Sequence, residues 1–180
     1  MPAVHDIFTQ YLKLCTYCDL FWKSVFSKYP EQFQCIEGCS SCCELQSVNA
    51  LEAYSIGINL QKKRLSGSRL NSSQTTCVFL KSDHCEIYAY RPIICRTHGL
   101  LLSNSESPRI STCLKNFTNS SIVIDLPYIL NTDMLTTNLM KLNIAFCIVC
   151  GAKENASMRF NLSDIFSGNI PEFLKDAISL

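Results

Sequence analysis

Apolar residues recur at three- and four-residue steps along the first 30 residues, which marks one face of a long helix. The apolar stripe begins at Val4 and ends at Tyr29, and the proline that follows ends the helix. The same spacing predicts a second helix over residues 45–63, with Gln61-Lys62-Lys63-Arg64 at its end. Cationic residues suit that position because the last carbonyl groups of a helix are unpaired.

The second half of the chain contains one more long apolar periodicity, over residues 133–150. We expect a third helix there, with Asp133 capping its start and Gly151 closing its end. A short terminal helix is predicted to begin near Pro171, because proline is accepted at a first helical position. Between the long helices, residues 66–76 and 103–121 are polar and predict a linker and a loop, and residues 77–100 mix short extended pieces with turns.

These patterns predict a mainly α protein, a small helical domain around an irregular, cysteine-rich metal-binding core. With 180 residues and 47% hydrophobic composition, the chain fits a single domain, 1–180. Within it we expect a cysteine-cluster core at 35–113 and helical flanks at 1–30 and 133–180.

Charge and hydropathy exclude several classes of partner. The net charge is +1 and the pI is about 7.4, so there is no electrostatic case for a nucleic acid or an anionic membrane. The amino terminus lacks the pattern of a secretory signal, and the longest apolar run, residues 144–152, falls far short of the ~20 residues that span a bilayer. We therefore expect a cytoplasmic protein.

The chain contains twelve cysteines, four of them in the nine residues CIEGCSSCC at positions 35–43. In a reducing compartment, clustered thiols favour metal binding over disulfides, although disulfides stay open as an alternative. Gly38 and the two serines indicate a tight turn, in which several sulfur atoms can point to one centre. Adjacent residues rarely bind one ion in the same way, so Cys42 and Cys43 serve two centres or one of them lies outside the coordination sphere.

Further cysteines follow at suitable spacing to complete two sites of four thiolates. The predicted metal-binding set is Cys35, Cys39, Cys42, Cys43, Cys77, Cys85, Cys95 and Cys113. Eight thiolates around two divalent ions leave a net charge of −4, which requires compensation in a protein interior. Arg91 and Arg96 are the candidates for this role beside the cofactor, and ordinary surface arginines are the alternative.

The residue types do not decide between Zn²⁺ and an iron–sulfur cluster, since both accept four thiolates. Cys35-x3-Cys39-x2-Cys42 also has the spacing of radical S-adenosylmethionine enzymes. The barrel of those enzymes needs more residues than follow the motif here, and no strand–helix alternation is present. No Ser/His/Asp arrangement, paired-carboxylate cleft or phosphate loop occurs, so we assign no catalytic residue and leave open whether the protein is an enzyme.

The order of these motifs resembles the YkgJ-type cysteine-cluster family, described as zinc- or iron-chelating domains. The resemblance covers about residues 35–113 and rests on CxxxCxxCC, then CVFLKSDHCEIYAYRPIICR, then a later cysteine. It implies a metal-binding domain whose biochemical role is mostly unassigned. Some longer relatives are linked to methylation of flagellin lysines, but no methyl-donor site is visible in this chain.

Four cysteines lie outside this segment, in the pairs Cys15-x2-Cys18 and Cys147-x2-Cys150. If the first and third long helices pack together, the pairs could form a further zinc site. The favoured alternative is that they are small core residues. The histidines are few: His98 and His84 lie near cysteines and could act as ligands, whereas we expect His5 to be solvated.

We therefore expect a metal-binding protein with a structural, carrier or interaction role and an unknown protein partner. The alternative is an iron–sulfur redox protein, or a component of a methylation-type protein-modifying system.

Overall fold

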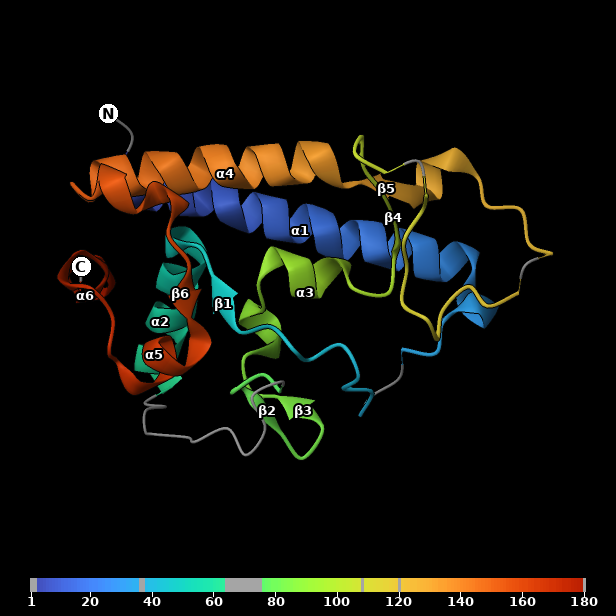
Figure 1. The fold of residues 1–180 in the computed structure, drawn as a ribbon, viewed down its shortest axis with the longest axis horizontal. Coiled ribbons are helices and arrows are strands. Elements are labelled where there is room, and N and C mark those ends of the chain that lie inside the picture. The colour runs from blue at the N-terminus through green and yellow to red at the C-terminus, as the bar shows by residue number, and fades with distance from the viewer. Residues whose placement is uncertain (1–2, 36–37, 64–75, 108, 120, 180) are drawn as a thin grey trace.

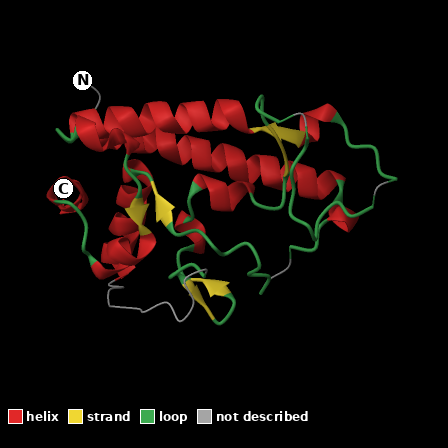
Figure 2. Ribbon diagram, viewed as in Figure 1, coloured by secondary structure: helices red, strands yellow, loops and turns green. Residues whose placement is uncertain are grey.

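The computed structural model describes residues 3–35, 38–63, 76–107, 109–119 and 121–179 (Figure 1). Helices make up 56% of the structure, and its strands are only two or three residues long (Figure 2). The mainly α class is confirmed. The expected linker at 66–76 lies outside the described residues except for Thr76.

Two long helices lie side by side along the molecule: α1 (Val4–Lys28) and α4 (Thr132–Val149) (Figure 1). Both bounds agree with the predicted ranges to within two residues, and a 3₁₀ turn, Pro30–Gln32, follows α1. The cap of α4 differs from the prediction. The side chain of Asn131, not of Asp133, accepts hydrogen bonds from the first backbone N–H groups. Asn131 lies one residue before the helix, where its side-chain amide oxygen can reach those N–H groups.

Helix α2 (Ala50–Lys63) is buried on almost every side, because α4, α5 (Leu162–Ser167) and α6 (Glu172–Ser179) all pack against it. It begins five residues later than predicted. Residues Ser47–Val48 instead form strand β1, which pairs with β6 (Phe160–Asn161) in antiparallel fashion. The side chain of Asn49 then accepts the N–H of Glu52 and starts the helix.

The segment between α2 and α4 contains the short elements that surround the cysteines. They are the antiparallel strands β2 (Leu80–Lys81) and β3 (His84–Cys85), helix α3 (Ile93–Thr97), and the parallel strands β4 (Leu101–Ser103) and β5 (Ile129–Asn131), with 3₁₀ turns at Tyr88–Tyr90 and Leu126–Tyr128. A further 3₁₀ turn, Lys153–Ser157, follows α4. Periodicity does not predict α3 or α5, because each is shorter than two turns.

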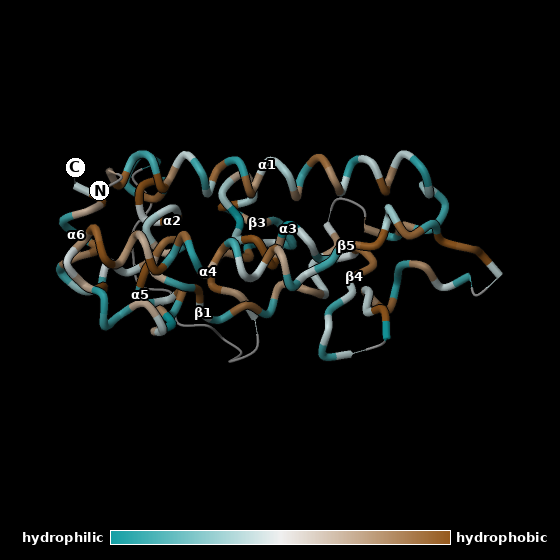
Figure 3. Tube along the Cα trace, turned by 90° about the horizontal axis from the view of Figure 1, so that it is seen from above, coloured by the Kyte–Doolittle hydropathy of each residue, from teal (hydrophilic) through white to brown (hydrophobic). Residues whose placement is uncertain are grey.

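The hydrophobic core forms one cluster that joins all the long helices. Its largest fully buried side chains include Tyr11 of α1, Phe146 of α4, and Phe79, which lies just before strand β2. Figure 3 shows hydrophobic and hydrophilic stretches alternating along α1, as expected for a helix with one buried face. Across the described parts of the chain, we find no helix with the length and apolar character that a membrane crossing requires.

Candidate metal centre

All twelve cysteines are free thiols. Their effects on one another's pKa divide eight of them into two groups of four. The first, which we call the loop group, contains Cys35, Cys39, Cys42 and Cys113, all in loops. Burial raises the pKa of Cys42, and the charges of the other three thiols raise it further. Burial likewise raises the pKa of Cys35, with contributions from Cys113 and Cys39. These four thiols are therefore close enough for the charge of one to affect the pKa of another.

The second, the core group, contains Cys43, Cys77, Cys85 and Cys95. Burial raises the pKa of Cys95 to about 12, with contributions from the other three thiols of the group. Burial also raises the pKa of Cys43 to about 12, and Cys42, Cys85 and Cys77 add to that rise. Cys77 and Cys85 pack against the hydrophobic core, which gives the group its name.

Local backbone contacts bring the core group together. Strands β2 and β3 are joined by Ser82 and Asp83, both with positive φ (47° and 62°), which makes a tight two-residue turn. The carboxylate of Asp83 accepts a hydrogen bond of 2.7 Å from Ser40, so the hairpin is tied to the cysteine-rich loop. The backbone N–H of Cys77 donates to the carbonyl of Cys43 at 2.8 Å.

Three of the eight thiols receive a hydrogen bond from the backbone N–H two residues ahead. Burial raises the pKa of Cys77 and of Cys85, and the N–H groups of Phe79 and Ile87 offset part of that rise. The pKa of Cys39 is lowered, first by the hydroxyl and then by the N–H of Ser41. Such donors stabilise a thiolate, the form that binds metal.

The loop group also receives side-chain donors. The Lys115 ammonium lies 3.8 Å from the Cys39 sulfur, and the Asn116 amide donates to the Cys35 sulfur at 3.1 Å. Sequence analysis does not identify Asn116 as a site residue. Only its place three residues after Cys113, typical of a turn, connects it with the motif.

Arg91 and Arg96 both lie against α1. Both donate to the carboxylate of Asp19, at 3.2 Å and 2.5 Å respectively. Arg96 is only 6% exposed, and also donates to the carbonyls of Arg91 and Ala89. The positive charge of Arg91 lowers the pKa of Cys85, whose largest shift is the rise due to burial. Arg96 holds α3 against α1, and its charge acts on Cys15 and Cys18. Arg91 contributes positive charge near Cys85 of the core group.

All three histidines are exposed. His84 on β3 is exposed, and its Nδ1 lies 2.7 Å from the carbonyl of Ser82. Partial burial lowers the pKa of His98, and nearby Glu44 opposes that shift. His5 is exposed beside Asp6 at the start of α1.

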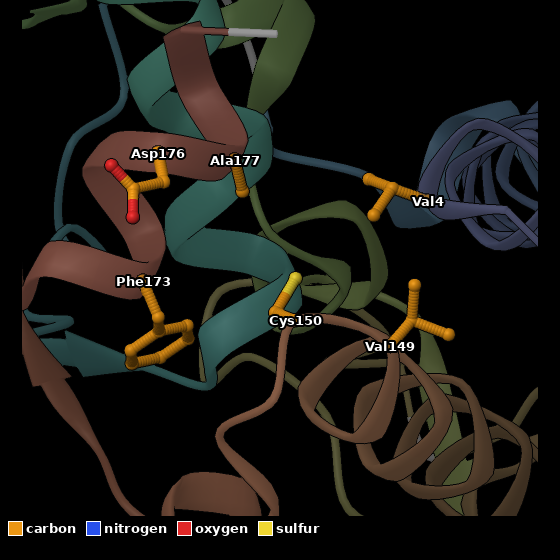
Figure 4. Close-up of a pocket in the computed structure, with 6 residues that line it drawn as sticks. All are labelled: Val4, Val149, Cys150, Phe173, Asp176 and Ala177. Carbon is orange, nitrogen blue, oxygen red and sulfur yellow. The ribbon is translucent and has the colours of Figure 1, made fainter.

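The two outlying cysteine pairs lie at different levels of the helix pair. Cys150 lines a shallow surface pocket together with Val4, at the beginning of α1 (Figure 4). Cys15 lies further along α1, about 16 Å from Val4 at a helical rise of about 1.5 Å per residue. Cys15, Cys18 and Cys147 are buried in the hydrophobic core. The pairs do not meet, although α1 and α4 pack together.

As they stand, no three His, Cys, Asp or Glu side chains of the described residues lie close enough together to hold one ion. Metal binding at either group therefore requires side-chain movements that bring the sulfur atoms to coordination distance, about 2.3 Å from zinc. The donor set itself fits a thiophilic metal, because each group offers four thiols and nearby N–H donors.

Comparison with known proteins agrees with this chemistry. Residues 34–114 match the CxxCxxCC family model, described as "Putative zinc- or iron-chelating domain". The resemblance in the motif order is confirmed over this segment, which includes all eight cysteines of the two groups. No curated protein and no solved structure is significantly similar to the chain. The family description supports a metal ligand here without choosing between zinc and iron.

Proposed function

We propose that the protein binds two metal ions, zinc or iron, one in the loop group and one in the core group. The family match covers all eight cysteines and supports a metal ligand. The thiols whose charges raise the pKa of Cys42 differ from those that raise the pKa of Cys95, which supports two separate groups. Cys42 lies in a turn and Cys43 directly follows it, so one short segment can contribute to two centres.

The proposed role is structural or carrier, since four thiolates fill a tetrahedral coordination sphere and leave no open position for a substrate. A bound ion would also connect the loops that contain these thiols. The cysteine-rich loop and the segment around Cys113 contain little regular secondary structure, and an ion that binds both contributes folding free energy.

The charge of such a centre is partly compensated by the surroundings. Two divalent ions and eight thiolates give a net charge of −4. Lys115 beside Cys39 and Arg91 near Cys85 supply positive charge, and the N–H donors at three thiols supply partial charge. The remaining charge is tolerable because all eight cysteines are at least partly exposed to solvent.

An iron–sulfur redox protein is the second candidate. The observation that favours it is the dense spacing of Cys35, Cys39 and Cys42, which suits a cluster with several iron atoms. A measurement of metal and acid-labile sulfide separates the two candidates.

The decisive measurement is metal and acid-labile sulfide per chain, on protein purified without oxygen. Two metal ions without sulfide would support the proposal, whereas iron with matching sulfide would support the redox alternative. A chain that binds no metal would contradict both.

The division into groups is tested by Cys42→Ser and Cys43→Ser, with the buried Cys15→Ala as the control. Each of the first two variants should keep one ion, the double variant none, and the control both. If the double variant still keeps one ion, Cys42→Ser and Cys43→Ser remove the same ion, and the two-group assignment is wrong.

A further inference from the structure

Asn116 is an almost fully buried amide, 2% exposed, at the point where three loops meet. Its Oδ1 accepts the backbone N–H of Gln34 at 2.9 Å, and its Nδ2 donates to the carbonyl of Gly99 at 2.9 Å. A backbone donor on one side and a backbone acceptor on the other fix the orientation of the amide. The second hydrogen of Nδ2 is thereby directed at the sulfur of Cys35, 3.1 Å away.

Gly99 shows how closely these groups approach one another. Its φ is +89°, and a β-carbon placed there would lie 2.8 Å from Asn116 Nδ2 and 3.0 Å from Cys35 Sγ. Both distances are shorter than normal contacts between heavy atoms, so only glycine fits without displacing the amide or the thiol.

The backbone around Asn116 is held as firmly as its side chain. Its N–H donates to the carbonyl of Cys113 at 3.0 Å, and the next N–H, of Phe117, donates to Gln32 at 2.9 Å. Phe117 has a φ of +54°, uncommon for a residue with a side chain, and its ring packs 5.1 Å from that of Phe33. These contacts connect the loop that contains Cys113 to the loop that contains Cys35.

We propose that Asn116 is a positioning residue that holds the Cys35 thiolate in the loop group and so sets how tightly this group keeps its metal ion. An N–H donor directed at a bound thiolate offsets its negative charge and fixes its rotamer, and loss of such a partner typically lowers metal affinity about 10- to 100-fold. The proposal rests on the proposed function, and it assigns a role to a residue outside the matched segment 34–114.

Two substitutions test this role. Asn116→Ala removes every side-chain hydrogen bond of Asn116, including the 3.6 Å contact of the Cys35 thiol with Oδ1. Asn116→Asp keeps the size of the side chain and the bond from Gln34 but replaces the donor with an oxygen that faces the Gly99 carbonyl and the Cys35 sulfur. Both should weaken binding of one of the two ions, about 10- to 100-fold for Asn116→Ala and more for Asn116→Asp.

The chain offers a matched control in Asn143 of α4. It is 3% exposed, and its amide likewise bridges two backbone groups, accepting from Leu51 at 3.0 Å and donating to Ala156 at 2.8 Å. Asn143→Ala should lower the melting temperature while leaving both metal affinities within about twofold of wild type, since its partners belong to the helical region.

The readouts are Zn²⁺ affinity by competition with a chromophoric chelator, and the thiolate-to-Co²⁺ charge-transfer absorption per chain. Wild-type protein is measured first, because a chain that binds no metal would overturn the proposed function itself. If wild type binds two ions, unchanged affinities in Asn116→Ala would overturn the positioning role alone. Weakening of both ions to the same extent in all three variants would also overturn it, because that result indicates general destabilisation.

Discussion

Substitution of Gly99 by alanine tests how tightly the loop group is built. A new methyl group meets two obstacles there: a backbone with φ of +89°, and the atoms Asn116 Nδ2 and Cys35 Sγ at 2.8 and 3.0 Å. Gly168 provides the control. It ends α5 with a φ of +77°, and a β-carbon added there would find nothing within 4 Å. Gly168→Ala therefore measures the backbone cost alone.

The magnitudes follow from these two environments. A left-handed conformation costs a residue with a β-carbon about 1–2 kcal/mol, so Gly168→Ala should lower the free energy of unfolding by that amount. Overpacking of a tight site adds about 1–3 kcal/mol, so Gly99→Ala should cost about 2–5 kcal/mol in total. For a chain of this size, the difference between the two variants corresponds to a melting temperature lower by about 2–12 °C.

The assay is thermal unfolding of both variants with the same excess of Zn²⁺, together with metal content per chain. Gly99→Ala should melt below Gly168→Ala and should lose one ion, whereas Gly168→Ala should keep both. Equal melting temperatures and equal metal content in the two variants would refute the reasoning, because the contacts of Gly99 would then have no energetic consequence.

Three further predictions concern the surroundings of the site. Asp19→Asn weakens the pairing of the buried Arg96 and should cost about 1–2 kcal/mol in urea unfolding, whereas neutralising the exposed Glu172 should cost less than about 0.5 kcal/mol; equal costs would contradict this. Burial raises the pKa of Glu52 above 4.5, so the native state binds its proton more tightly than the unfolded state does. The contribution of Glu52 to the free energy of unfolding therefore falls as pH rises from 4.5 through the raised native pKa. The stability of Glu52→Gln relative to wild type should therefore increase from pH 5 to pH 8, and a constant difference would contradict the burial argument. Cys15→Ala should cost about 1 kcal/mol by the loss of packing and remove no metal; a lost ion would place this cysteine in a site.

The long helices could be predicted from the sequence because each exposes only one face to solvent, and its apolar residues therefore repeat with the helical period. The first and third predicted helices agree with α1 and α4 to within two residues. Helix α2 shows the limit of this argument. Its predicted start was wrong because β1 takes Ser47 and Val48 into a ladder with residues over 100 positions away. Periodicity in a local window contains no information about such a partner.

The chemistry of the candidate centre could also be predicted from the sequence. Eight thiols in a fixed order, with glycine in the first turn, indicate metal binding whatever the fold, because ligand chemistry belongs to the residue type. Their division into a loop group and a core group depends on tertiary contacts. So do the pairing of Arg91 and Arg96 with Asp19, and the separation of the two outlying cysteine pairs along α1 and α4.

Asn116 illustrates the difference best. In the sequence it is a polar residue in a polar loop, and nothing in its neighbours distinguishes it from Asn119. In the structure it contacts Gln34, Gly99 and Cys35, which lie 17 to 82 positions away. Residue identity determines that a thiol can bind a metal ion. Only the folded chain determines which donors lie beside that thiol, because hydrogen bonds act over about 3 Å in space and take no account of distance along the sequence.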